Sequence, residues 1–263
     1  MDLSNFLLLK NIIHDKALNK SIYYLANPGN YGDGLIREGT LDFFKEIGLE
    51  YRELYLTKSR DFPRGNQFHW RRSRHWKKAC KNGGLLIFGG GGAWCHLWDH
   101  SKIVETLANA FEVIVLPSTY EKRYAIDNVT FFRRDEEESK VSMPKSIFCH
   151  DMAFYLSKRT FTGSSVSSGI GYFFRSDAES AGQVSIPDNN RDISTEGNSL
   201  TPVQGFINAI SSFHEIHTDR LHVSIAAALL NKKVHLYAGS YFKNKAVFKA
   251  SLKPYFKNIK FHL

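Results

Sequence analysis

The sequence predicts an α/β protein of two Rossmann-like lobes with a cleft between them, and three observations lead to this prediction. Short apolar runs alternate with helical segments along the 263-residue chain, which is typical of parallel sheets joined by helical crossovers. A Ser-, Thr- and Gly-rich stretch at residues 157–168 interrupts the alternation and indicates a linker. The length also suits two lobes, since domains of about 100–150 residues are the commonest.

The first predicted lobe comprises residues 1–160. A β-rich run, SIYYLA, is followed by a glycine-rich loop and an amphipathic stretch, which predicts strand, loop and helix. Further short apolar runs predict more strands, and RRDEEES starts a helix between the last two. The predicted strands are residues 21–26, 50–56, 84–88, 112–116, 129–132 and 146–150, with helices at residues 35–48 and 101–110.

The second predicted lobe comprises residues 161–263 and shows the same alternation. Ligands of parallel α/β folds bind outside the carboxyl ends of the strands, so we expect the site in the cleft between the lobes. A polar, turn-rich stretch at residues 188–199 predicts a mobile loop. The predicted strands are residues 169–174, 213–217 and 233–237, and the predicted helices are residues 202–211, 223–230 and a segment from Asn244 onwards.

The composition excludes several classes of protein. With 43% hydrophobic residues the chain can form packed cores, which excludes a mainly disordered protein. The formal charge of +9 indicates an acidic partner: a nucleic acid, an anionic membrane surface or a phosphorylated substrate. No uncharged apolar run approaches the ~20 residues of a membrane span. A signal peptide is not expected either, because Asp2 precedes the first apolar stretch and Lys10 interrupts it.

Neither a disulfide framework nor a metal site is expected. Cys80, Cys95 and Cys149 are odd in number and contain no Cys-x-x-Cys pair, which fits a reducing cytoplasm. His214 and His217 lie three residues apart on a predicted strand, so their side chains face opposite sides and do not readily chelate one ion. We therefore expect a cytoplasmic protein without a metal.

The stretch FHEIHTDRLHVSIAAALL at residues 213–230 joins a strand to an apolar helix. Thr218 or Asp219 is expected to cap that helix, which places Arg220 and His222 at its tip. A helix tip favours anions through its free N–H groups and dipole, so a cation and an imidazole there suit phosphate or carboxylate chemistry. A capped core helix with incidental polar residues is the alternative.

Two glycine-rich loops follow predicted strands. NPGNYGDG at residues 27–34 permits close approach of a ligand to the backbone, and Asp33 either caps the next helix or binds a hydroxyl. Residues 89–92 are four consecutive glycines, whose entropic cost favours a ligand-facing loop over a mere connector. The residues that follow suit either a sugar-stacking surface or, for the tryptophans, the core: Trp94, His96, Trp98 and Asp99.

Basic residues are notable in two further places. A run from Arg60 to Lys81 mixes cations with aromatic residues, which suits nucleic acid, an anionic lipid-linked substrate at a membrane, or a solvated helix face. Arg175 follows the first strand of the second lobe and is accompanied by Asp177 and Glu179. Arg175 therefore either points into the cleft or forms a structural ion pair.

Taken together, these motifs resemble the polysaccharide pyruvyltransferase family. NxGNxGD follows the first strand, GGGG a middle strand, RxDxE opens the second lobe and TDRLH precedes the small-residue helix, in an order that matches the family over nearly the whole chain. The resemblance implies a GT-B-like arrangement of the lobes and transfer of a pyruvyl group from phosphoenolpyruvate onto two hydroxyls of one sugar. Phosphoenolpyruvate is a co-substrate, and no cofactor is implied. The implied acceptor is a saccharide or lipid-linked oligosaccharide, met in the cytoplasm or at the inner face of the membrane.

The resemblance also implies site residues by position. Arg220, Leu221 and His222 match the donor-site motif, and Arg175 matches an arginine that holds the donor. Where the family's glycine loop commonly continues to an acidic residue, this chain has His96, with Asp99 three residues later. The implied catalytic residues are His222, Arg220, His96 and Asp99, and the implied substrate-binding residues are Arg175, Leu221, Lys243, Asn244, Asp33, Asn30, Gly90, Gly91 and Trp94.

The residue types suit this chemistry. Arg175 and Arg220 can neutralise the phosphate and the carboxylate of the donor. His222 can protonate the enol methylene carbon, and His96, Asp99 or Asp33 can act as base. Two alternatives stay open: a nucleotide-sugar glycosyltransferase with the same fold, and a nucleic-acid-binding protein that uses the basic run, which is the least favoured.

Overall fold

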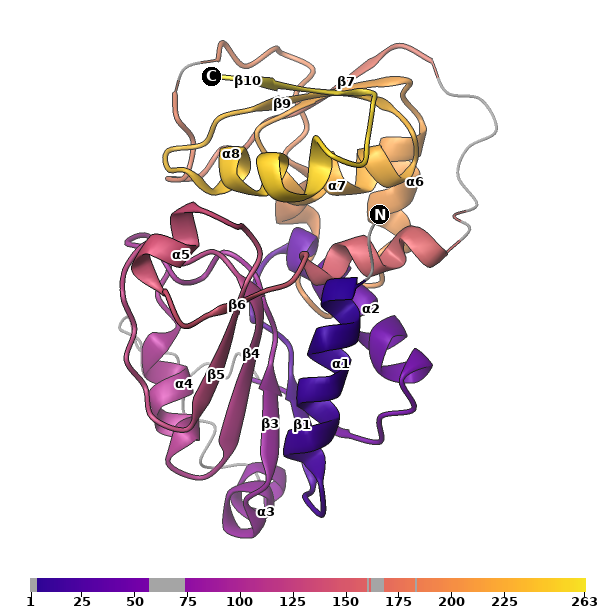
Figure 1. Cartoon of the computed structure of the whole chain (residues 1–263). Helices are drawn as coiled ribbons and strands as arrows, with labels where there is room; N and C mark the ends of the chain where they lie inside the picture. Colours follow the sequence, from indigo (N-terminus) through magenta and orange to yellow (C-terminus); the bar gives the residue numbers. More distant parts are fainter. Residues whose placement is uncertain (1–3, 57–73, 160, 162–167, 183) are drawn as a thin grey trace.

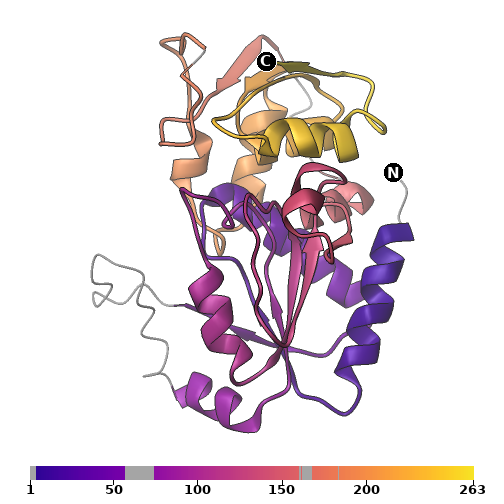
Figure 2. The same ribbon diagram turned by 60° about the vertical axis from the view of Figure 1, so that its left-hand side comes forward.

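The computed structural model describes residues 4–56, 74–159, 161, 168–182 and 184–263. They form two stacked lobes, each built on one parallel sheet (Figures 1 and 2). The first sheet has six strands in the order β2-β1-β3-β4-β5-β6, and the second has four in the order β10-β9-β8-β7. The predicted α/β class with two parallel sheets is therefore confirmed.

The first sheet lies between two layers of helices. The strands are short and apolar, so the central ones are buried on both faces, as parallel strands usually are. The strands are β1 (Ile22–Leu25), β2 (Arg52–Leu54), β3 (Leu85–Phe88), β4 (Glu112–Ser118), β5 (Val129–Arg133) and β6 (Ile147–Phe148). The helices are α1 (Ser4–Ala17), α2 (Tyr31–Glu46), α3 (Arg74–Asn82), α4 (Ser101–Ala108) and α5 (Glu138–Ser142).

Each face of the first sheet has its own core. On one face, α1 and α2 contribute Phe6, Leu9 and Phe43 to a cluster with strand residues such as Ile87. On the other face, the cluster includes Trp76 of α3 together with residues of α4. The chain then enters the 3-10 helix η2 (Met152–Lys158), which packs on α2 and on the second lobe.

The second lobe carries its helices on one face of its sheet. These helices lie between the sheet and the first lobe, so the other face of the sheet is turned outwards (Figures 1 and 2). The strands are β7 (Ile170–Phe173), β8 (Glu215–Thr218), β9 (Lys233–Tyr237) and β10 (Ile259–His262). The helices are α6 (Gln204–Ser211), α7 (Leu221–Leu229) and α8 (Lys243–Val247), with the 3-10 helix η3 (Ile193–Glu196) and the π-helix η4 (Phe248–Leu252).

The amino-terminal end of α2 joins the two lobes. Its Tyr31 and Leu35 belong to the core cluster of the second lobe, beside Phe206. The Tyr31 hydroxyl donates to the Pro202 carbonyl at 2.7 Å, and the Phe206 amide donates to it at 3.2 Å. A shared core of this kind fixes the lobes against each other, and the loop before α2 is held at the junction.

Each strand expected from the sequence has a counterpart in β1 to β9, although β2 and β6 are shorter than predicted. The sequence interpretation missed α1 and the edge strand β10, and it had α7 begin two residues late. The predicted linker and the boundary between residues 160 and 161 lie where the two sheets are connected, and most of that stretch is outside the described residues. That boundary stays a prediction.

The stretch at residues 188–199, predicted as a mobile loop, is anchored on both lobes. Ile193 is buried in the core of the second lobe, and the Ser199 amide donates to the Gly29 carbonyl of the first lobe at 3.3 Å. Asn198 pairs with Asn30 in an isolated antiparallel bridge. The turn-rich composition predicted a loop correctly, but the apolar Ile193 within it provides an anchor.

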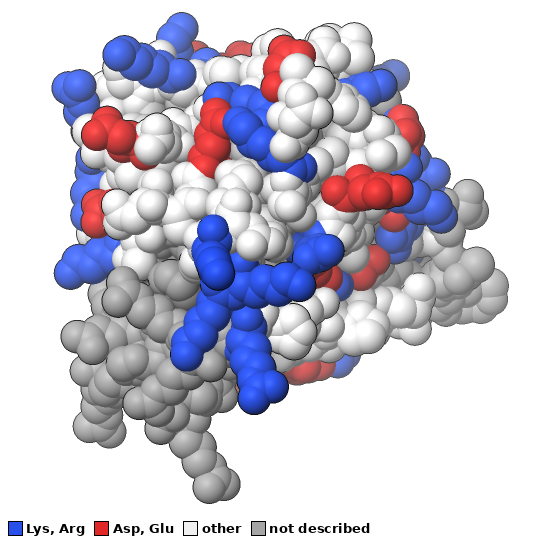
Figure 3. Space-filling model, turned by 90° about the horizontal axis from the view of Figure 1, so that it is seen from below, with Lys and Arg blue, Asp and Glu red and all other residues white. Residues whose placement is uncertain are grey.

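The basic run is described only from Arg74 onwards, as α3. Trp76 and Ala79 are buried, while the Lys and Arg side chains of the helix are exposed. On the face of the molecule seen from below, Lys and Arg side chains gather in one patch (Figure 3). This part of the run thus forms the solvated helix face that was one interpretation of it, and residues 57–73 lie outside the described part. None of the described helices is long and apolar enough to cross a membrane.

Candidate active site

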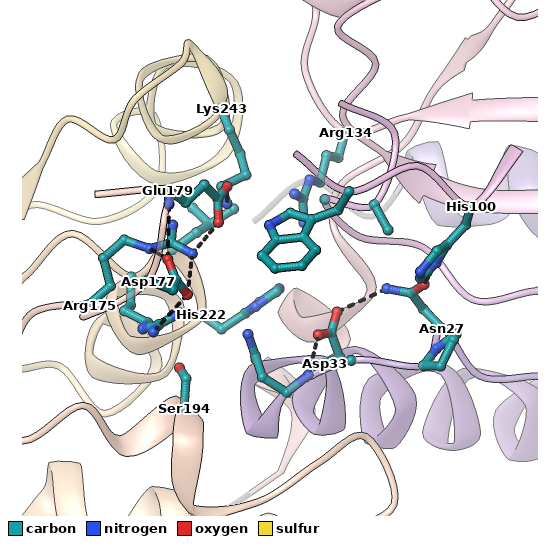
Figure 4. A pocket seen from close by; sticks show the side chains of 18 residues that line it. Asn27, Asp33, His100, Arg134, Arg175, Asp177, Glu179, Ser194, His222 and Lys243 are labelled. Atoms are coloured by element: carbon teal, nitrogen blue, oxygen red, sulfur yellow. Dashed lines mark hydrogen bonds and ion pairs between the residues drawn. The ribbon is translucent and has the colours of Figure 1, made fainter. Parts of the chain in front are cut away.

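A pocket of about 440 Å³ lies at the junction of the lobes. Figure 4 shows its labelled side chains facing each other from two sides, with Arg175 and Glu179 on one side and Asn27 and His100 on the other. The first lobe contributes Asn27, Pro28, Gly29, Asn30, Asp33, Gly92, Ala93, Trp98, His100 and Arg134. The second lobe contributes Arg175, Asp177, Glu179, Ser194, Arg220, Leu221, His222 and Lys243.

The second-lobe wall is built from the carboxyl ends of β7 and β8. The Thr218 hydroxyl accepts from the Arg220 amide at 2.9 Å and donates to the Phe173 carbonyl at 2.7 Å. Asp219 accepts from the Arg175 amide at 2.8 Å. These bonds tie the two strand ends together, so both arginines enter the pocket from a fixed backbone.

The expected helix cap differs from the observed one. Arg220, and not Thr218 or Asp219, occupies the N-cap position of α7, and its side chain makes no capping bond. Thr218 and Asp219 instead bond to the backbone of Arg220 and Arg175. The first turn of α7 is therefore left without a side-chain cap at the point where the pocket begins.

The cations of this wall are paired with carboxylates. Arg220 makes two bonds to Asp192, at 2.8 and 2.6 Å, and one to Asp177 at 3.1 Å. Arg175 contacts Asp177 at 2.7 Å and also pairs with Glu179, which in turn pairs with Lys243 of α8. Bidentate pairing of this kind fixes the plane of a guanidinium group.

Burial and the neighbouring positive charges have opposite effects on the pKa values of these carboxylates. Burial penalises the charged form of Asp177, but the hydrogen bond and charge of Arg175 outweigh it and lower its pKa to about 2. Glu179 behaves alike: its pKa falls to about 2 because Lys243 and Arg175 outweigh burial. Both acids are therefore ionised at neutral pH, and the wall holds its arginines in a charged, oriented network.

His222 stands in the first turn of α7 beside a second buried network. A side chain at Gly32 would place its Cβ 2.8 Å from the His222 Nδ1 atom, so only glycine allows the ring to lie against α2. The His222 Nε2 atom lies 3.6 Å from Asp151, which Arg134 contacts at 2.6 Å. Burial disfavours the charged form of Asp151, but His222 and Arg134 hold its pKa well below its usual range. A fixed carboxylate beside an imidazole orients it for proton transfer.

The first-lobe wall is a chain of three polar side chains. The Asn27 amide nitrogen donates to Asp33 at 3.1 Å, and the amide oxygen lies 2.8 Å from the His100 Nδ1 atom. Asp33 also accepts from the Asn30 amide at 2.9 Å, which closes a capping box at the start of α2. Burial raises the pKa of Asp33 and lowers that of His100 to about 4. His100 is therefore neutral at pH 7.

The glycines of the tetraglycine loop are required mainly by the path of the backbone, and most of them do not line the pocket. A Cβ on Gly90 would lie 2.3 Å from the Pro117 carbonyl, and Gly91 has a φ of +130°, where side chains are strained. Gly92 alone among the four glycines lines the pocket. Gly90 and Gly91, predicted to bind substrate, do not line the pocket, and they allow the chain to leave β3 between neighbouring segments.

Four further predicted residues do not line the pocket. His96 is exposed and contacts Glu121 at 2.7 Å, and Asp99 contacts Lys122 at 2.7 Å. Trp94 is buried in the core of the first lobe. Asn244 lies behind the wall, where its side chain donates to the Asp219 carbonyl at 2.6 Å.

The structure also brings in residues that sequence reasoning missed. Asn27, His100, Arg134, Asp151 and Ser194 line the pocket or stand directly behind it. The rule that ligands lie at the carboxyl ends of parallel strands could have found three of them, since Asn27 follows β1, Arg134 follows β5 and Asp151 follows β6. Predicted residues that do line the pocket are Asn30, Asp33, Arg175, Arg220, Leu221, His222 and Lys243.

Comparisons with known proteins identify one matching family and a similar crystal structure. The sequence model of one family, polysaccharide pyruvyl transferase, matches residues 30–241. A crystal structure of a functionally uncharacterised protein from Klebsiella pneumoniae subsp. pneumoniae NTUH-K2044 is similar, with 28% identity, a TM-score of 0.74 and 98% of each chain covered. A search of curated proteins returned no match. The matched region contains every predicted pocket residue except Lys243, which lies two residues beyond it.

Proposed function

Because the chain belongs to the polysaccharide pyruvyl transferase family, we propose that it transfers the pyruvyl group of phosphoenolpyruvate to two hydroxyls of a sugar, forming a ketal. The observation that carries this proposal is the pair of buried arginines, Arg175 and Arg220, beside His222 in one wall of the pocket. Phosphoenolpyruvate offers a phosphate and a carboxylate, and two oriented guanidinium groups can bind both. The donor is a co-substrate, so the reaction needs no cofactor.

In this proposal the second-lobe wall binds the donor. Arg175 and Arg220 bind its anionic groups, and Lys243, within the same charge network, adds positive charge. Asp177, Glu179 and Asp192 orient the cations before the donor arrives. Fixed cations also stabilise the negative charge on the departing phosphate.

His222 supplies the proton that starts the reaction. The π electrons of the enol double bond take a proton from His222 onto the methylene carbon, which leaves the central carbon electrophilic. A sugar hydroxyl adds there as a base removes its proton, and phosphate then departs with the electrons of its C–O bond. The second hydroxyl then adds to the same carbon and gives its proton to the deprotonated His222, which closes the ketal and restores the acid. Asp151 and Arg134 hold the His222 ring in place for this step.

We assign the base to Asp33 from among the three sequence candidates. His96 and Asp99 are paired with Glu121 and Lys122 outside the pocket, whereas Asp33 lines it. Burial raises the pKa of Asp33, which makes its ionised form a stronger base than an ordinary carboxylate. The acceptor sugar then lies on the first-lobe wall, against Asn27, Asp33 and His100.

The proposal also covers the arrangement of the lobes, the acceptor and the place in the cell where the enzyme works. Two lobes with a pocket at their junction suit a GT-B-like enzyme, with the acceptor on residues 1–160 and the donor on residues 161–263. The acceptor is a saccharide or a lipid-linked oligosaccharide of a cell-surface polysaccharide. The exposed cations of α3 would favour contact with an anionic inner membrane surface, so we propose a cytoplasmic enzyme that works close to that surface.

A direct test incubates the protein with phosphoenolpyruvate and a panel of galactose-, glucose- and mannosamine-bearing acceptors. We expect phosphate release and an acceptor product that carries the added pyruvyl mass. In parallel, phosphoenolpyruvate should raise the melting temperature and nucleotide sugars should not, because a ligand that binds only the folded state stabilises it. Stabilisation by a nucleotide sugar alone would favour a glycosyltransferase and contradict the proposal.

A further inference from the structure

The outward face of the second sheet carries a cluster of histidines that the pocket does not use. Side chains of a strand alternate between its faces. Ile216 of β8 is buried towards the helices, so Glu215 and His217 project outwards. His235 of β9 is the register partner of His217 on the neighbouring strand. The helices of this lobe lie on the opposite face (Figure 1), which leaves these three side chains with partial access to solvent.

Three potential ligand atoms converge in this cluster. The Nε2 atom of His217 lies 3.1 Å from Oε1 of Glu215, and the Nε2 atom of His235 lies 3.2 Å from the same oxygen. One ligand atom from each residue lies within 4.8 Å of the other two. Ligands placed about 2.0–2.1 Å from a tetrahedral Zn²⁺ are separated by roughly 3.3–3.4 Å. The spacing around Glu215 is therefore close to that of a metal site.

The other nitrogen of each ring has its own partner. The Nδ1 atom of His217 lies 3.0 Å from the Tyr237 hydroxyl, and the Nδ1 atom of His235 lies 2.8 Å from Nε2 of His262. Partners on the far nitrogen hold the ring orientation of a histidine ligand. They leave both Nε2 atoms directed towards Glu215.

One atom of the cluster lacks the bond that its burial requires. The Nε2 atom of His235 is buried and makes no hydrogen bond, although it lies 3.2 Å from a carboxylate oxygen. Oε1 of Glu215 can only accept, so this contact requires either a proton on Nε2 or a cation between the two atoms, and buried polar atoms without partners are rare. A cation at the point where the three side chains meet would supply the missing partner.

We propose that Glu215, His217 and His235 bind one Zn²⁺ ion on the outward face of the second sheet. Two imidazoles and a carboxylate are a donor set that suits zinc and does not suit magnesium. Water occupies the fourth position, on the solvent side. The rings of His217 and His235 are stacked, with centroids 4.3 Å apart and planes 6° from parallel, so binding tilts them towards a common point.

The neighbouring charges affect the expected affinity of the site for zinc. Lys233 contacts the other carboxylate oxygen of Glu215 at 3.0 Å, which leaves Oε1 for the metal but adds a competing positive charge. The ion would link β8 to β9 shortly before the backbone of Asp219 and Arg220. Zinc binding is expected to stabilise the second lobe. The proposal of this site does not depend on the proposed transferase activity.

The test uses the full chain without a histidine tag, freed of metal by a chelator. Calorimetric titration with ZnCl₂ should give saturable binding of one ion per chain, and ZnCl₂ should raise the melting temperature. MgCl₂ should do neither. His217→Ala, His235→Ala and Glu215→Gln should each weaken zinc binding at least ~10-fold, since each removes one of three ligands.

His214→Ala is the matched control, because His214 is an exposed residue directly before β8 and outside the cluster. It should bind zinc as the unaltered chain does. Glu215→Gln keeps the size of the side chain, so it serves as the test if a histidine variant fails to fold by circular dichroism. Absence of saturable zinc binding, or equal binding by the folded Glu215→Gln variant, would overturn the proposal.

Discussion

The second-lobe wall of the pocket pairs its arginines with carboxylates, whereas burial shifts Asp33 and His100 of the first-lobe wall towards their uncharged forms. Arg175 and Arg220 are fixed by carboxylates whose pKa values lie at or below their usual range. Across the pocket, burial raises the pKa of Asp33 and lowers that of His100. Both groups there are shifted towards their uncharged forms.

Under the proposed function, this difference suits the two walls to two unlike substrates. A dianionic donor gains most from oriented cations that are already desolvated, because no reorganisation is needed on binding. A sugar hydroxyl instead needs acceptors and a base whose proton affinity is close to that required for transfer. His222 stands between the two walls, so it can serve the donor while the acceptor approaches from the side of Asp33.

The largest effect is expected at His222, where the two walls meet. His222→Ala should lower kcat for phosphate release by ~10²–10⁴-fold, which is the usual contribution of a general acid. The affinity for phosphoenolpyruvate, measured by thermal shift, should change little, because the arginines remain. His214→Ala is the control and should keep full activity. Retention of activity within ~10-fold by a folded His222→Ala variant would remove the general acid from the mechanism.

The next largest effect is expected at Asp33 on the first-lobe wall. Asp33→Asn should lower kcat by about 10²-fold, because the amide cannot accept the hydroxyl proton. The base acts only when ionised, so kcat/KM of the unaltered enzyme should fall as the pH drops through the raised pKa of Asp33. The variant should lack this acidic limb. A pH profile of both proteins checks it.

His96→Ala is the matched control for that assignment. The resemblance to the family placed either His96 or Asp99 where the family commonly has an acidic residue, yet the His96 side chain is exposed and bonded to Glu121. Activity should therefore change less than about twofold, since exposed pairs contribute little. A greater loss for His96→Ala than for Asp33→Asn would reverse the assignment of the base.

A smaller effect is expected from Arg220→Lys on the second-lobe wall. Lysine keeps the charge but loses the planar fork that binds two oxygens. The Kd for phosphoenolpyruvate should rise about 10-fold, or ~1.4 kcal/mol, as measured by calorimetry. Arg159→Lys, at an exposed pair with Asp42, should leave the Kd unchanged. Equal affinity of Arg220→Lys and the unaltered chain would show that Arg220 does not bind the donor with both nitrogens.

The sequence predicted the second-lobe wall better than the first. Arg175, Arg220 and His222 were predicted because each lies two to four residues after the end of a strand that the sequence predicts, within motifs that resemble the family. His96 and Asp99 were expected in the site but do not line the pocket, because position along a loop does not determine the direction of the loop. The neighbours that turn it away, Glu121 and Lys122, lie more than twenty residues later in the chain.

Other features depended on contacts between distant segments. Arg134 and Asp151 meet across two strand ends, and His235 meets His217 only through strand pairing. Neither pairing follows from spacing in the sequence. The edge strand β10 was missed because IKFH is short and lies at the chain terminus, where the apolar pattern is too brief to tell a strand from a coil.

The smallest expected effect concerns Asp219, which supports the second-lobe wall from behind. Burial raises its pKa to about 6, against the charges of Arg175 and Arg220. A raised carboxyl pKa contributes stability that is complete below ~3.9, the unfolded value, and is lost as the pH rises through about 6. Asp219→Asn should therefore increase the free energy of unfolding at pH 7.5 by about 1 kcal/mol and flatten its decline between ~pH 4 and 6.

Urea unfolding at several pH values measures this effect. Asparagine keeps an oxygen that accepts from the Arg175 amide, so the tie between β7 and β8 should survive the change. Asp127→Asn, at an exposed position, is the control and should leave the pH profile as it is. A loss of stability at pH 7.5 in Asp219→Asn would mean that the ionised carboxylate is needed to hold the two arginines, and that the second-lobe wall depends on charge behind it as well as within it.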